Sequence, residues 1–242
     1  MGRTTSFFNL QDALAQPDCA VCRLKAEAAD QYLDSLIWES VNDPGIRRRI
    51  RKARGFCYEH AWRLEPHRES VGVTIIMHDV LKSMLKVTED AQFQKLPIFS
   101  MRRTKKALDP QQPAAETAKV VAELSPQASC PVCVEADEME GIYLDTLIEN
   151  LIHEEDLLAA FQSSDGLCLP HFRQALTRMR DEAVFEVLMD AQRVIWKRLV
   201  DQLSEIIRKA DYRFKDEARG EEVGASVRAI AAIAGARRDQ DR

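Results

Sequence analysis

The sequence lacks the features that mark membrane-spanning, secreted and low-complexity chains. No apolar run approaches the 18 residues of a bilayer span, and residues 1–16 lack the charged-then-apolar order of a leader peptide. Only nine glycines and nine prolines occur among 242 residues, which excludes a collagen-like or broadly disordered chain. We therefore expect a folded, cytoplasmic protein that has no membrane partner.

The sequence also has little that indicates catalysis. It contains no Ser/His/Asp order, no glycine-rich phosphate loop, no HExxH motif and no paired-carboxylate motif. In the cytoplasm, six cysteines are more typical of metal binding or redox chemistry than of structural disulfides. The chain is therefore expected not to be an enzyme.

The cysteines occur in two copies of one pattern. Cys19-Ala-Val-Cys22 precedes Cys57-Tyr-Glu-His60 by 34 intervening residues, and Cys130-Pro-Val-Cys133 precedes Cys168-Leu-Pro-His171 by the same number. A single offset of 111 residues superimposes all eight positions. This self-similarity predicts a tandem duplication.

Both copies carry the donor set of a structural zinc site. A Cys-x-x-Cys motif at a helix start directs two sulfurs to one point, and the helix N-terminus stabilises their thiolates. The Cys-x-x-His motif adds a thiolate and an imidazole, which completes a tetrahedral shell without an open position. We predict two Zn²⁺ ions per chain, each clamping the first helix of its copy to the last, although the sequence leaves open whether a site closes within one copy or across the two. The predicted ligands are Cys19, Cys22, Cys57, His60, Cys130, Cys133, Cys168 and His171.

Apolar spacing predicts an all-α fold. A helical stripe covers residues 23–41, a short helix follows Asp43-Pro44 and ends before Gly55, and a longer periodic stretch covers 73–85. The second copy repeats this plan, and its last helix is predicted from Pro170 to about Lys209. Each copy is thus a three-helix unit, and the two are expected to pack about a pseudo-two-fold axis because each alone exposes an apolar face.

Composition divides the chain into four parts. They are a zinc-clamped unit at 1–92, a proline-containing basic linker at 93–129, a second zinc-clamped unit at 130–210 and a tail at 211–242. A short helix is expected in the linker near Thr117–Leu124. The tail is compatible with either a docked helix or a frayed end.

Basic residues favour a further interpretation. Residues 1–110 have a net charge of +4, and residues 111–242 have −9. A basic segment at 47–54, with the run at 101–106, is a candidate nucleic-acid surface, although a solvated helix face that pairs with the acidic half is the plainer interpretation. The candidate contacts are Arg47, Arg48, Arg49, Arg51, Lys52 and Arg54.

For five other residues, the sequence predicts structural roles. Trp38, Trp62 and Trp196 are expected to be partly buried packing residues. Asp34 and Asp145 recur at the 111-residue offset but lie about 18 Å along a helix from the cysteine pair of their own copy. A helix cap or a tertiary ion pair is therefore expected for each aspartate.

Three functions stay open at this point. The first is a non-enzymatic helical zinc protein that presents helix surfaces to a protein partner. The second is a thiol redox or sulfur-handling protein that uses the Cys-x-x-Cys pairs, although the βαβ pattern usual for that chemistry is missing. The third is a nucleic-acid-associated factor, and mixed Cys/His ligation is also compatible with an iron–sulfur centre.

The duplicated Cys-x-x-Cys…Gly-x-Cys-x-x-His pattern resembles an uncharacterised family of prokaryotic proteins known only as a domain of unknown function. The likeness covers nearly the whole chain and implies a helical, metal-binding, cytoplasmic protein with no established activity. Ala20 stands where the second copy has Pro131, a departure that leaves the ligands intact. The other segments that resemble the family are Tyr32-Leu33-Asp34-Ser35-Leu36, Val41-Asn42-Asp43-Pro44, Gly55-Phe56-Cys57 and Arg208-Lys209-Ala210-Asp211-Tyr212-Arg213-Phe214.

Overall fold

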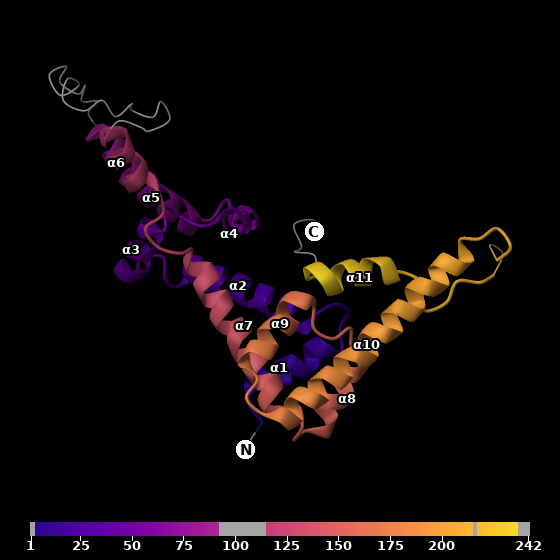
Figure 1. The fold of residues 1–242 in the computed structure, drawn as a ribbon. Helices are drawn as coiled ribbons and strands as arrows, with labels where there is room; N and C mark the ends of the chain where they lie inside the picture. Colours follow the sequence, from indigo (N-terminus) through magenta and orange to yellow (C-terminus); the bar gives the residue numbers. More distant parts are fainter. Residues whose placement is uncertain (1–2, 92–114, 215–216, 237–242) are drawn as a thin grey trace, which may run out of the picture. The chain divides into compact units, whose positions relative to one another are not determined.

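The computed structural model describes residues 3–91, 115–214 and 217–236. Every regular element in these ranges is a helix, so the predicted all-α class is confirmed (Figure 1). None of these helices is both long and apolar enough to cross a membrane. The chain divides into two compact units, which we call the terminal unit (Met1–Ala29 with Glu135–Arg242) and the central unit (Asp30–Val134).

These units do not follow the predicted boundaries of the two sequence copies, 1–92 and 130–210. The chain passes between the units inside α2 (Ala20–Trp38) and again inside α7 (Pro131–Asn150). A helix of about 20 residues extends for roughly 30 Å, which is long enough for its two ends to pack into different cores. Each sequence copy therefore contributes residues to both units.

The terminal unit is built around the second half of the chain. It contains α1 (Thr5–Leu14), the start of α2, most of α7, α8 (Glu155–Ser163), α9 (Leu169–Arg178), α10 (Glu182–Lys209) and α11 (Ala225–Ala234). Helix α8 packs on α1 and α10, and α11 packs on α9 and α10, so the tail contains a docked helix. Large fully buried core side chains are Phe7, Leu10, Leu144, Leu147, Leu151, Leu157 and Phe161.

The predicted last helix from Pro170 to Lys209 is wrong, because it is two helices. Met179 follows α9 with an extended backbone (φ −66°, ψ 131°). The Asp181 side chain then caps α10 by accepting hydrogen bonds from the backbone N–H groups of Ala183 and Val184. No glycine or proline marks this break, so the apolar periodicity of the sequence continues across it.

The central unit contains the end of α2, α3 (Pro44–Lys52), α4 (Tyr58–Trp62), a 3₁₀ helix (Glu65–His67), α5 (Val71–Glu89), α6 (Ala115–Leu124) and the start of α7. As the sequence predicts, Asp43 caps α3, and its Oδ1 accepts from the backbone N–H of Ile46 at 2.7 Å. Helix α5 packs on α3 and on α6, the short helix expected in the linker. The basic run at 101–106 lies outside the described residues.

The prediction for two of the tryptophans is also wrong. Trp38 is 66% exposed and Trp62 is 59% exposed. Trp38 is the last residue of α2, and Trp62 contacts the ring of the exposed Tyr58 on α4. Trp196 packs edge-on against Phe172 at 5.2 Å between ring centroids, as a packing residue should.

Candidate metal centres

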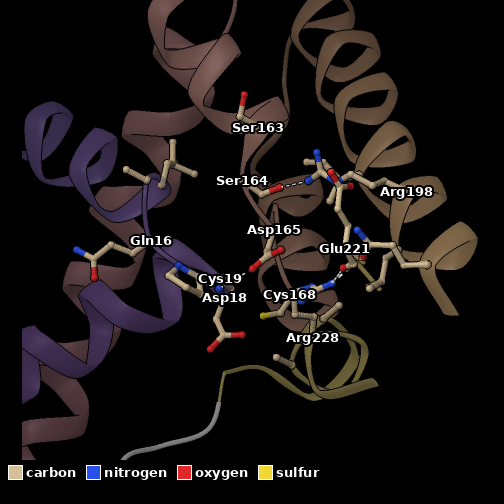
Figure 2. A pocket seen from close by; sticks show the side chains of 18 residues that line it. Gln16, Asp18, Cys19, Ser163, Ser164, Asp165, Cys168, Arg198, Glu221 and Arg228 are labelled. Carbon is tan, nitrogen blue, oxygen red and sulfur yellow. Dashed lines mark hydrogen bonds between the residues drawn. The ribbon is translucent and has the colours of Figure 1, made fainter. Parts of the chain in front are cut away.

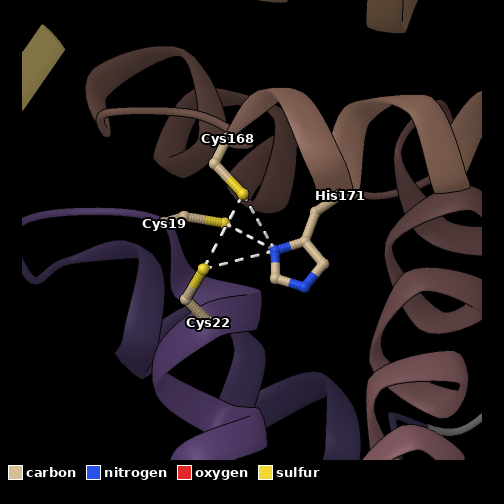
Figure 3. Close-up of side chains that lie close together, drawn as sticks. All are labelled: Cys19, Cys22, Cys168 and His171. Carbon is tan, nitrogen blue, oxygen red and sulfur yellow. Dashed lines mark hydrogen bonds between the residues drawn. The ribbon is translucent and has the colours of Figure 1, made fainter. Parts of the chain in front are cut away.

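One group of candidate ligands lies in the terminal unit, and we call it the terminal cluster (Figure 3). Cys19 and Cys22 come from the start of α2, and Cys168 and His171 come from the start of α9. Nδ1 of His171 lies 3.4 Å from Sγ of Cys19, 3.4 Å from Sγ of Cys22 and 3.1 Å from Sγ of Cys168. The sulfurs of Cys22 and Cys168 are 3.7 Å apart.

The other group, the central cluster, lies in the central unit. Cys57 and His60 come from the start of α4, and Cys130 and Cys133 come from the start of α7. Nδ1 of His60 lies 3.2 Å from Sγ of Cys57, 3.3 Å from Sγ of Cys133 and 3.8 Å from Sγ of Cys130. The sulfurs of Cys57 and Cys133 are 3.6 Å apart.

The structure overturns the prediction that each ion clamps the first and last helices of its own copy. Each cluster joins the Cys-x-x-Cys motif of one copy to the Cys-x-x-His motif of the other. The crossing follows from the fold, because α2 and α7 begin in one unit and end in the other. The Cys-x-x-Cys motif at each helix start therefore lies in a different unit from the Cys-x-x-His motif of the same copy.

The spacing of the donor atoms fits a tetrahedral zinc shell. With Zn–S bonds of about 2.3 Å and a Zn–N bond of about 2.0 Å, the edges of the tetrahedron are roughly 3.8 Å between sulfurs and 3.5 Å between sulfur and nitrogen. The eight separations given above, 3.1 to 3.8 Å, lie close to those edges, and all donor atoms of each cluster lie within 4.8 Å of one another. All six cysteines are free, so none is committed to a disulfide.

The local backbone places the cysteines at helix starts. Cys57 and Cys168 occupy the N-cap positions of α4 and α9 with nearly the same conformation, φ −66° with ψ 167° and φ −66° with ψ 159°. Gly55 and Gly166, two residues earlier, have φ of 99° and 71°. Because only glycine adopts such angles without strain, each glycine turns the chain towards the following cysteine, whereas the sequence predicts Gly55 only as the end of the preceding helix.

A buried glutamine fixes the loop before Cys168. Gln192 of α10 is fully buried, and its amide bonds both backbone groups of Leu167: Oε1 accepts from the N–H at 3.0 Å, and Nε2 donates to the carbonyl at 3.2 Å. A Cβ added to Gly166 would lie 2.9 Å from this amide. The loop position of Cys168 is therefore set by close packing against α10 as well as by glycine.

Without a bound cation, the clustered thiols ionise unequally: hydrogen bonds with the thiols of Cys168 and Cys19 and with His171 lower the pKa of Cys22, whereas two other thiols resist ionisation. Hydrogen bonds with the thiols of Cys168 and Cys22, together with burial, raise the pKa of Cys19. Burial and the neighbouring thiols of Cys57 and Cys130 raise the pKa of Cys133 to about 12. A divalent cation inverts this preference because it compensates the thiolate charges, so metal binding releases protons.

Two further contacts to the terminal cluster were not foreseen from the sequence. Oε1 of the buried Glu140 lies 3.1 Å from Nε2 of His171, and the Glu140 carboxylate also pairs with Lys25. The backbone N–H of Ala236 donates to Sγ of Cys22 at 3.4 Å. No repeated pattern signals these residues, since Glu140 and Lys25 correspond to Ala29 and Ala136 in the other copy.

A cavity of about 530 Å³ borders the terminal cluster (Figure 2). Cys19 and Cys168 contribute to its lining, so the cavity borders two of the four candidate ligands. Asp18 and Arg228 also line it, and the Asp18 N–H donates to Asp165 Oδ2 at 2.8 Å.

The recurring aspartates make tertiary contacts with basic side chains, in line with one of the two roles expected for them. Asp145 forms an ion pair with Arg178 at 2.9 Å, and Asp34 lies 3.2 Å from Nε2 of His67, which makes an ion pair only when that imidazole is protonated. His67 and Arg178 are themselves related by the 111-residue offset. These carboxylates therefore stabilise helix packing and are not metal ligands.

Some basic side chains of the segment at 47–54 form ion pairs or hydrogen bonds within the central unit. Arg47 and Arg51 pair with Asp79 of α5, and Arg54 donates to the backbone carbonyl of Glu123. The exposed cations of this segment are Arg48, Arg49 and Lys52. The candidate nucleic-acid surface is therefore smaller than the sequence suggests.

Comparison with known proteins gives a family and a relative, both without a known activity. The model of a family described as "Family of unknown function (DUF6062)" matches residues 1–240. An "Uncharacterized 23.9 kDa protein in xynA 3'region" of Caldicellulosiruptor sp. (strain Rt8B.4) is 27% identical over 195 residues, which cover 81% of this chain and 83% of that protein. No solved structure matches the chain.

Proposed function

The chain belongs to the family of unknown function DUF6062, and we propose that it is a non-enzymatic protein whose two Cys₃His centres each bind a structural Zn²⁺ ion. The observation that carries this proposal is the convergence of eight donors from four chain segments into two groups at tetrahedral spacing. The two groups use every cysteine of the chain.

The donor set favours zinc over other common metals. Thiolates and imidazole are preferred by zinc and by iron–sulfur clusters, whereas magnesium and calcium prefer oxygen ligands. Four protein donors close the shell, so neither ion has a position at which it would activate water. The remaining role for each ion is to hold helix starts together, so that the outer helix surfaces of this cytoplasmic protein stay available to a protein partner.

Metal analysis of the purified chain tests this proposal. We expect two zinc ions per chain and no thiols that react with a mild thiol reagent until the metal is chelated. Catalytic disulfide reduction by protein that contains little metal would instead support the redox alternative. If the purified protein is coloured and contains iron, the two sites hold iron–sulfur centres and not zinc.

Zinc occupancy is expected to fall as the pH is lowered. All three thiols of a cluster must lose their protons to bind the ion and its imidazole must be neutral with a free Nδ1, and the pKa of both Cys19 and Cys133 is raised in the absence of a cation. Protons therefore compete with zinc, and the affinity should increase with pH. Zinc competition with a chelator of known pH dependence, measured from pH 5 to 8, checks this sign, and a pH-independent affinity would contradict thiolate ligation.

A further inference from the structure

Glu140 of α7 contacts the terminal cluster without being one of its four donors. Its Oε1 lies 3.1 Å from Nε2 of His171, and the side chains of both residues are less than a tenth exposed. The Glu140 carboxylate also accepts a hydrogen bond from Lys25 of α2. Lys25 in turn reaches Asp137, one turn earlier on α7, at 2.6 Å. A buried carboxylate is thus held in place between a lysine and the candidate ligand.

The orientation of His171 makes this contact chemically meaningful. The ring directs Nδ1 at the three sulfurs and Nε2 at Glu140 (Figure 3 shows the sulfur side). An imidazole that binds a metal through Nδ1 carries its proton on Nε2, and a carboxylate beside Nε2 accepts that proton in a hydrogen bond. Such a partner fixes both the tautomer and the ring orientation and makes the ligating nitrogen more basic.

We infer that Glu140, held by Lys25, is the positioning residue of the terminal centre and raises its affinity for zinc by orienting His171. The inference rests on the proposed function, because it concerns the ion that the cluster would hold. Glu140 touches the ligand and not the ion, so it acts through His171.

The sequence does not repeat this arrangement at the 111-residue offset. The 111-residue offset matches Glu140, Lys25 and Asp137 with three alanines, namely Ala29, Ala136 and Ala26. A methyl group neither accepts a hydrogen bond nor carries charge, so the second copy does not provide an equivalent carboxylate. The two centres are therefore different outside their shared Cys₃His shells, and loss of the Glu140 carboxylate should affect only one of them.

The test is a competition titration of the full chain with a zinc chelator, which reports two binding steps. We expect Glu140→Gln to weaken one step by about 10-fold and Glu140→Ala by up to about 100-fold, with the other step unchanged. Gln keeps the shape of the side chain and one acceptor oxygen but loses the negative charge, so its effect on zinc affinity should be smaller than that of Ala. Glu138→Gln is the matched control, because Glu138 is exposed on the same helix and its change removes the same charge.

A second readout separates positioning from packing. In the zinc-loaded wild type, nitrogen NMR should show His171 with a slowly exchanging proton on Nε2, and this proton should exchange faster in Glu140→Ala. The inference would be overturned if Glu140→Gln and Glu140→Ala left the zinc affinity of both binding steps unchanged, or if they weakened both steps equally. Either result would leave the proposed zinc binding intact. A wild-type chain that binds no zinc would overturn the proposed function itself.

Discussion

A Cys19→Ser/Cys168→Ser double variant is expected to keep one zinc ion per chain, whereas Cys19→Ser/Cys57→Ser is expected to keep none. The first pair of substitutions removes two donors from the terminal cluster and leaves the central cluster whole. The second pair removes one thiolate from each cluster. Serine is a poor zinc ligand compared with a thiolate, so each damaged shell should lose its ion. Metal analysis after gel filtration gives the counts directly.

The same experiment distinguishes the two ways of closing the centres. If each copy closed its own site, Cys19 and Cys57 would share an ion, and the two double variants would give the opposite counts. The single variants Cys19→Ser, Cys57→Ser and Cys168→Ser serve as controls, since each should keep one ion in either case. Cys22→Ser/Cys168→Ser is a matched replicate, because these two sulfurs lie 3.7 Å apart in the terminal cluster.

Sequence separation could not have revealed the crossed pairing. Closure within a copy would join cysteines with 34 residues between them, whereas Cys22 and Cys168 are 146 positions apart. The entropy of closing the longer loop costs only about 1 kcal/mol more. Apparent binding energies of structural zinc, about 10–16 kcal/mol in small peptides, are far larger. Whether a centre closes within one copy or across the two therefore depends on how the helices pack, and the motif spacing does not determine that packing.

Features encoded by a few neighbouring residues were predictable. Asp43 and Pro44 start α3 because a carboxylate cap and a fixed φ favour a helix start wherever they occur. Gly55 and Gly166 adopt positive φ because no other residue does so at low cost. The eight candidate ligands were found in the same way, since the repeated motifs contain all of them.

Features that depend on distant partners were not predictable. The break between α9 and α10 is formed by Met179 and Asp181, neither of which is a strong helix breaker. Glu140 approaches His171 only because α7 packs beside α9, and the other copy has an alanine at the matching position. A comparison of the two copies therefore identified what they share, the donor shells, and missed what makes the terminal centre different.

Cys57→Ser is expected to unfold the central unit while the terminal unit stays folded, and Cys168→Ser is expected to do the reverse. Each substitution removes one ion, and the binding energy lost, on the order of 10 kcal/mol, is comparable with the whole stability of a typical domain at 5–15 kcal/mol. The central unit is the more vulnerable, because its described part has few fully buried large side chains outside α2, namely Ile50 and Ile76. Hydrogen exchange measured by mass spectrometry should show loss of protection from 44 to 89 in Cys57→Ser.

The controls follow from the same structure. Tyr58→Ser changes the adjacent residue, which is 78% exposed, and should retain both ions and normal protection. Chelation of zinc from the wild type should reproduce the combined exchange pattern of Cys57→Ser and Cys168→Ser. Protection that falls equally in both units of Cys57→Ser would show that they unfold as one. Helices α2 and α7 each contribute residues to both units. In Cys57→Ser, the boundary between protected and unprotected amides should therefore fall inside these two helices, near Asp30 and Val134. The core of the terminal unit still holds the other end of each helix there.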